Sequence, residues 1–99
     1  MFDPKDYAYQ IEVTLQAIFK CRKFELGGIA DANFIEKHPF IAIAFALGNY
    51  YNKADPSFKE KIEEFLNVFY LDMGKSMAEI GEERTKKLVE DFKEIIATI

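Results

Sequence analysis

The residues best suited to chemistry in this 99-residue chain are its one histidine, His38, and its one cysteine, Cys21. Glu36 lies two residues before His38, and residues at that spacing project from different sides of a helix. Metal sites in helical bundles use a glutamate three residues before a histidine, commonly twice, so that both ligands point inward. The sequence lacks that pattern, so we expect His38 to cap or expose the turn before Pro39 and to bind no metal.

Cys21 has cations on both sides in the sequence, Lys20 before it and Arg22 and Lys23 after it. Nearby positive charge makes a thiol more reactive, but adjacent residues on a helix point apart, so these cations do not converge on the sulfur. We interpret Cys21 as a small apolar residue of the core. The sequence also offers no paired histidine and no strand-turn-helix context for acyl transfer, so it predicts no enzyme, no catalytic residue and no cofactor.

The basic trio of Lys20, Arg22 and Lys23 is also a candidate phosphate-binding patch. The whole chain carries 13 Lys+Arg against 17 Asp+Glu, a formal net charge of −4, which opposes the counterion displacement that nucleic-acid binding needs. Cations near the end of a helix complement the helix dipole without any ligand. Nucleic acid is therefore disfavoured as a partner outside a larger complex, and Arg22 is expected to extend to solvent or to pair with a carboxylate such as Glu25.

Two further patterns have structural explanations. Gly27–Gly28 lacks the second spaced glycine and the lysine-serine pair of a phosphate loop, so we interpret it as a helix stop. Glu82 with Lys86, and Glu83 with Lys87, have the four-residue spacing of ion pairs on a helix, which predicts a solvated face.

Helix caps and apolar spacing predict the elements that position these residues. Asp3-Pro4 suits the first turn of a helix over about residues 4–26, because an aspartate caps the free amides and proline needs no partner at the first position. The main apolar face of this helix consists of Tyr7, Ile11, Leu15, Ile18, Phe19 and Leu26. A second group of apolar residues, Tyr9, Val13, Ala17 and Phe24, lies about half a turn away among Asp6, Gln16 and Lys20, and we take Tyr9, Val13 and Phe24 as its contact stripe. We expect that stripe to be exposed on the single chain and to contact a partner.

The middle of the chain predicts a short turn and then a central helix. Asp31 is a suitable N-cap for the turn, and Pro39 predicts a kink or a break because it has no amide hydrogen and disfavours helical geometry at His38. The run from Phe40 to Leu47 is apolar on every side, so we expect a buried helix there. The run is too short to cross a bilayer, which needs about 20 residues.

The last third of the chain predicts two more helices. Asp55-Pro56 repeats the capped start, and an apolar stripe follows at three- and four-residue steps, made of Phe58, Ile62, Phe65, Leu66, Phe69 and Met73. Gly74 suits the end of that helix, and Ser76 with Glu79 has the spacing of a capping box that would start a fourth helix at Met77. Gly81 is the alternative break.

These elements define the expected architecture and location. We expect one domain over residues 1–99, an all-α antiparallel bundle of about four helices with the second kinked near Pro39. A single cysteine and the lack of a signal-peptide pattern favour a cytoplasmic protein that contacts no membrane. Residues 55–99 hold seven basic and eleven acidic residues and so carry the whole net charge. We expect that acidic half to face solvent or a basic partner.

The main functional hypothesis is a non-enzymatic protein–protein interaction or assembly module that self-associates through apolar helix faces. With 10 Phe and 5 Tyr, the chain has more apolar surface than a bundle of this size readily hides. We expect its partner to be protein, a second copy of the chain, bound through the stripe of Tyr9, Val13 and Phe24.

Two other classes of function stay open. One is a small helical accessory subunit of a nucleoprotein complex, for example a CRISPR effector-type assembly, that lends the basic trio to a phosphate path, although no residue motif links the chain to such subunits. The other is a small ligand-binding helical protein with a pocket near Asn49, Tyr50, Tyr51 and Tyr70. A transcription factor is disfavoured because no helix-turn-helix pair ends in a basic recognition helix.

Overall fold

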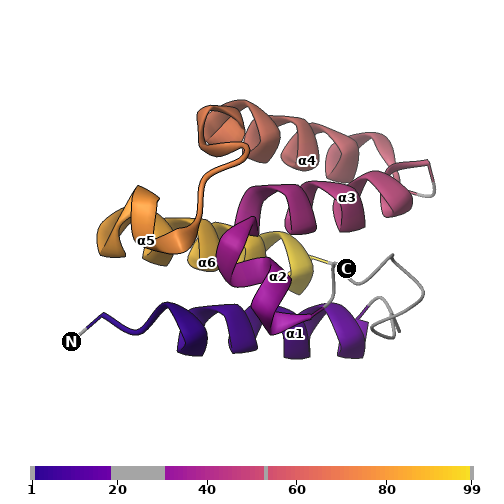
Figure 1. Cartoon of the computed structure of the whole chain (residues 1–99). Coiled ribbons are helices and arrows are strands. Elements are labelled where there is room, and N and C mark those ends of the chain that lie inside the picture. Colours follow the sequence, from indigo (N-terminus) through magenta and orange to yellow (C-terminus); the bar gives the residue numbers. More distant parts are fainter. Residues whose placement is uncertain (1, 19–30, 53, 99) are drawn as a thin grey trace.

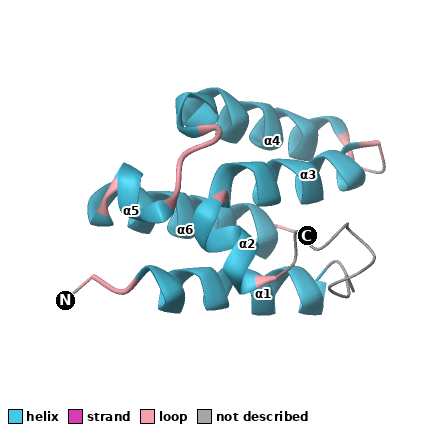
Figure 2. Ribbon diagram, viewed as in Figure 1, coloured by secondary structure: helices cyan, strands magenta, loops and turns pink. Residues whose placement is uncertain are grey.

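The computed structural model describes residues 2–18, 31–52 and 54–98, and within these ranges the chain forms helices and turns with no strand (Figures 1 and 2). Its elements are α1 (Pro4–Ile18), α2 (Ala32–Lys37), α3 (Pro39–Tyr51), α4 (Pro56–Phe69), the 3-10 turn η1 (Tyr70–Asp72), α5 (Met77–Ile80) and α6 (Glu82–Ala97). The all-α class is confirmed. The bundle of about four helices is not, because the described ranges contain six α-helices, two of them very short.

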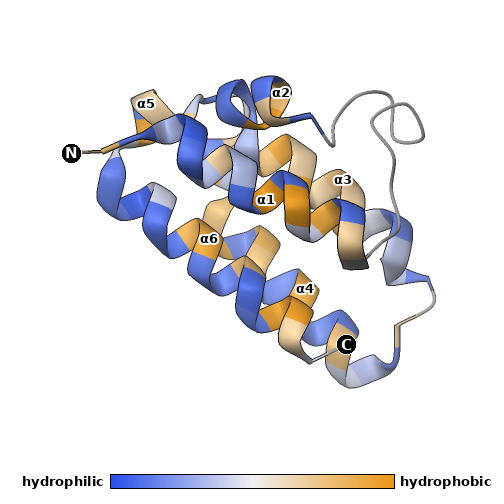
Figure 3. Ribbon diagram, turned by 90° about the horizontal axis from the view of Figure 1, so that it is seen from below, coloured by the Kyte–Doolittle hydropathy of each residue, from blue (hydrophilic) through white to orange (hydrophobic). Residues whose placement is uncertain are grey.

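The helices enclose one core by packing in a closed series of pairs. α1 packs against α2 and α6, α6 against α4, α4 against α3, and α3 against α2, while α5 lies on α6 (Figure 1). The fully buried large side chains come from every α-helix of this series, among them Leu15, Ile35, Leu47, Phe69 and Phe92. α1 is an outer member of this arrangement, and no other described helix covers its outward side (Figures 1 and 3).

The helix starts predicted from capping residues are confirmed, since each of these residues has a side-chain oxygen that accepts a backbone amide hydrogen bond. Three aspartates cap in this way: Asp3 accepts from Lys5 at 3.1 Å, Asp31 from Asn33 at 2.8 Å and Asp55 from Phe58 at 2.8 Å. The capping box is complete, because Ser76 Oγ accepts from the Glu79 amide at 3.2 Å and Glu79 Oε1 accepts from the Ser76 amide at 3.0 Å. The hydrogen bond from the Ser76 amide to the Glu79 carboxylate is the main reason why the pKa of Glu79 is lowered.

The structure decides between the alternatives left open for the predicted interruptions. At Pro39 the chain does not merely kink, since His38 ends α2 and precedes the first residue of α3. Gly74 and Gly81, treated above as alternatives, both adopt positive φ angles, +84° and +87°. The helix predicted from Met77 therefore ends after one turn at Gly81, and α6 begins as a separate helix.

Two predicted burials are wrong. The central helix α3 buries only one side, because Phe45 is 53% exposed and Gly48 is open to solvent. Met73, assigned above to the apolar stripe of α4, is 60% exposed. α4 ends at Phe69, so the helical spacing that would have turned Met73 inward is lost in η1 and the turn after it.

Candidate protein-interaction surfaces

Helix α1 has two apolar sides, and only one of them is covered by the rest of the described structure. Its inward side buries Ala8, Ile11 and Leu15 completely or nearly so. On the outward side Tyr9 is 58% exposed and Val13 46% exposed. Ala17, four residues after Val13, is also exposed, so an apolar row of three side chains follows this helix for two turns. We call Tyr9, Val13 and Ala17 the α1 row.

Charged groups near the α1 row are held toward other parts of the fold. The carboxylate of Glu12 accepts a hydrogen bond from the amide of Ala32, at the start of α2, at 3.3 Å. Gln10 donates to Asp6 at 3.2 Å and accepts from Lys93 Nζ of α6 at 2.6 Å. The row itself contains no charged side chain, which lowers the cost of removing it from water.

A second surface feature is an open groove of about 550 Å³ between α4 and α6. Its lining residues are Lys61, Glu64, Phe65 and Val68 from α4, and Asp91, Glu94, Ile95, Ala97 and Thr98 from α6 and its C-cap. Phe65 and Ile95, buried at 4% and 6% exposure, form an apolar floor. Val68, 45% exposed, extends that floor toward solvent. We call this feature the α4–α6 groove.

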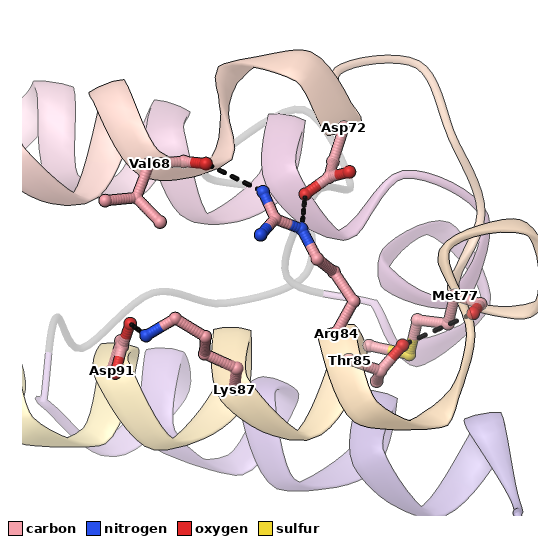
Figure 4. A network of polar contacts seen from close by, with 7 residues as sticks. All are labelled: Val68, Asp72, Met77, Arg84, Thr85, Lys87 and Asp91. Atoms are coloured by element: carbon pink, nitrogen blue, oxygen red, sulfur yellow. Dashed lines mark hydrogen bonds and ion pairs between the residues drawn. The ribbon is translucent and has the colours of Figure 1, made fainter.

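A polar network fixes the end of α4 to α6 beside this groove (Figure 4). Arg84 Nε donates to Asp72 Oδ2 at 2.9 Å, and Arg84 Nη2 donates to the carbonyl of Val68 at 2.7 Å. The guanidinium carbon also lies 4.8 Å from the centre of the Phe69 ring. Asp72 is 6% exposed, so one arginine neutralises a buried carboxylate and satisfies a carbonyl at the end of a helix.

Sequence reasoning missed the role of Arg84. The neighbouring glutamates and lysines predict only a solvated face, whereas Arg84 among them makes the contacts that join two helices. Lys87 also differs from expectation, since it pairs with Asp91 at 3.0 Å, four residues later, rather than with Glu83. The sequence feature that could have predicted this contact is Asp72, an acidic residue in an otherwise apolar stretch before Gly74. If such a carboxylate is buried, it needs a cation beside it.

The turn that this network holds is itself apolar and exposed. Tyr70 is 56%, Leu71 66% and Met73 60% exposed, while Asp72 between them points to Arg84 (Figure 4). Because Asp72 is held by Arg84, its apolar neighbours in the turn are left exposed to solvent. Together with Val68, these side chains form a dense run of exposed apolar residues.

Several predicted site residues lie outside the described part of the chain. These are Phe24 of the contact stripe, the basic trio of Lys20, Arg22 and Lys23, the single Cys21 and the stop at Gly27–Gly28. Tyr9 and Val13 are described and exposed, and their role in binding a partner stays a prediction.

His38 is half-buried in the break between α2 and α3. Its ring packs on Phe34, with 5.3 Å between ring centres, and its buried Nδ1 has no hydrogen-bond partner. Its side chain makes no capping hydrogen bond at the start of α3. Over the described ranges no three His, Cys, Asp or Glu side chains are grouped so that they could hold a metal.

The three tyrosines proposed above to line a pocket do not come together around one. The hydroxyl of Tyr51 donates a hydrogen bond to the carboxylate of Glu63 on α4, and this raises the pKa of Tyr51. Tyr50 packs edge-on against Phe58, with ring centres 5.3 Å apart, and Tyr70 lies exposed in η1. The α4–α6 groove lies elsewhere, and none of these tyrosines lines it.

Comparison with protein families, with curated proteins and with solved structures finds no match to this chain. None of the described helices combines the length and apolar character that a membrane span requires.

Proposed function

We propose that this chain is a non-enzymatic protein–protein interaction module that self-associates through the α1 row. The observation that supports this proposal is the half-exposure of Tyr9 and Val13 on a helix whose other apolar side is fully buried. A single exposed apolar side chain needs no explanation, but three exposed apolar side chains in a row along one helix face are typical of a contact surface. One cysteine and no disulfide suit a reducing compartment such as the cytoplasm.

The spacing of the α1 row suits pairing with a second copy across a twofold axis. If two α1 helices cross antiparallel at Val13, each Val13 meets the same residue of the other copy, and each Tyr9 faces Ala17 of the other copy. A large side chain then lies opposite a small one on both sides of the centre, the alternation that fills a helix interface. Gln10 and Gln16 flank the row, so like charges do not oppose each other beside it.

The test is solution mass by light scattering behind a sizing column, at low and at high salt. We expect the chain to run as a dimer of about twice 11.5 kDa. Val13→Asp should return it to a monomer, because the twofold would place two carboxylates in contact away from water. Val68→Asp is the matched control, since Val68 on α4 is 45% exposed against 46% for Val13.

The outcomes separate three cases. A dimer that Val13→Asp dissociates and Val68→Asp does not supports the α1 row as the contact. A chain that is monomeric at every concentration tested contradicts self-association. A dimer that survives Val13→Asp contradicts the assignment of the contact to the α1 row. Circular dichroism of each variant establishes that the variant is folded.

A further inference from the structure

The residues that line the α4–α6 groove have the spacing expected of a groove that binds a third helix. α4 contributes residues 61, 64, 65 and 68, and α6 with its C-cap contributes Ala97 and the set of residues 91, 94, 95 and 98. Both sets have the spacing i, i+3, i+4 and i+7, which is one face of a helix over two turns. Two such faces side by side form a channel about 10 Å long, since seven residues rise about 1.5 Å each.

The two edges of the groove are mainly acidic. Glu64 stands on the α4 side and Glu94 on the α6 side, and both are exposed. Asp91 adds a third carboxylate, which pairs with Lys87, and Lys61 is the one cation among the lining residues. The lining as a whole therefore carries three carboxylates against one ammonium group, with at least one carboxylate from each helix.

This charge distribution argues against a second copy of the chain placed groove to groove. Such a twofold contact would bring the acidic edges of one copy against those of the other, and like charges across an interface are unfavourable. The groove instead complements a partner that has an apolar strip with cations on both sides of it. Helices with that pattern bind grooves of this kind through anchors at i, i+3 or i+4, and i+7.

We propose that the α4–α6 groove binds an amphipathic helix of a different protein, with an apolar face that packs on Phe65, Val68 and Ile95 and with lysines or arginines that meet Glu64 and Glu94. This inference does not depend on the α1 row, because the two surfaces have no residue in common.

The probe is a synthetic amphipathic peptide of about 14 residues, with leucine at the a and d positions of two heptads and lysine at most other positions. One a position carries tryptophan, and because the chain itself has no Trp, the peptide's fluorescence reports binding without background. Two comparison peptides are used, one with glutamates in place of the lysines and one with the same composition in scrambled order. The titrations use the full chain at moderate salt.

The variants locate the binding site. Glu64→Lys with Glu94→Lys should weaken binding by about tenfold or more, since two attractive rim charges become repulsive. The matched control is Glu60→Lys with Glu90→Lys, which makes the same change in net charge on exposed residues of the same two helices outside the groove. Val68→Gln should also weaken binding by about tenfold, and Phe45→Gln, an exposed apolar position on α3 outside both surfaces, should not.

Binding of the lysine peptide alone, lost in the groove variants and kept in the controls, supports the proposal. Equal binding of the scrambled peptide, or an equal effect of the control charge reversals, shows non-specific attraction to an acidic protein and overturns it. Binding of the glutamate peptide with equal strength, or no binding of any peptide, also overturns it. None of these results bears on the mass measurement, so this proposal and self-association can fail separately.

Discussion

At the scale of single residues, Arg84 shows how one side chain can organise a surface. Its guanidinium contacts a buried carboxylate, a helix-end carbonyl and an aromatic ring at once. Lysine could not do this, because an ammonium is a compact charge without a planar fork of donors. The exposed apolar turn from Tyr70 to Met73 therefore has a fixed conformation, which makes it part of the shape beside the groove.

We predict that Arg84→Met lowers the free energy of unfolding by about 2 kcal/mol. The methionine keeps much of the apolar stem over Phe69 but leaves Asp72 buried without a cation, and the full cost of a buried pair is reduced here because Arg84 is 35% exposed. Urea unfolding followed by circular dichroism measures the change. Lys86→Met on the same helix is the control, and it should shift stability by less than about 0.5 kcal/mol. Equal losses in both variants would contradict a special role for Arg84.

At the scale of elements, the helix starts were predictable because a cap is a local feature. Asp31, Asp55 and Ser76 accept hydrogen bonds from amides two or three residues away, so sequence spacing alone contains the information. The extent of each helix was harder to predict. Whether Gly81 breaks a helix depends on how Met77 and Thr85 pack, and the hydroxyl of Thr85 donates to the carbonyl of Met77 at 3.3 Å across that break.

The break at Gly81 leads to a prediction about two glycines. Gly81 has φ +87° and ψ 170°, a conformation essentially closed to other residues, and no atom lies within 4 Å of an added Cβ. Gly81→Ala should therefore destabilise the fold by about 2 kcal/mol through backbone strain alone. Gly48→Ala is the matched control, because that site is equally open but lies within α3.

In Gly48→Ala the methyl group favours the helix, so this variant should be more stable than the parent chain by about 0.5–1 kcal/mol. Thermal or urea unfolding of both variants checks the opposite signs. If both glycine substitutions shifted stability in the same direction, the explanation from φ would be wrong.

At the scale of the whole molecule, sequence patterns predicted the all-α class but not the arrangement of helices. Caps and apolar stripes say which face of a helix is buried, and they do not say which helix covers it. The α4–α6 groove illustrates this, since its lining comes from residues 61–68 and 91–98, and only the packing of those helices brings the two sets together. In contrast, the sequence spacing predicted that Tyr9 and Val13 are exposed on the outward side of their helix, and both side chains are exposed.

The two proposed surfaces differ in chemistry, so salt should weaken contact at one of them and leave the other unchanged. Contact through the uncharged α1 row depends on apolar burial, and raising salt from about 0.05 to about 0.5 M should leave the dimer mass unchanged. Binding of the lysine peptide depends on Glu64 and Glu94, whose attraction is screened over that range, so its affinity should fall by about tenfold.

The same difference predicts that the two surfaces act independently. The monomeric variant Val13→Asp should bind one peptide per chain with the parent's affinity, because residues that share no contacts behave additively. Mass and peptide affinity measured on the same samples, at both salt concentrations, check this. If the peptide dissociated the dimer, or if salt changed mass and affinity together, one surface would serve both contacts, and the separate assignments to α1 and to the α4–α6 groove would be wrong.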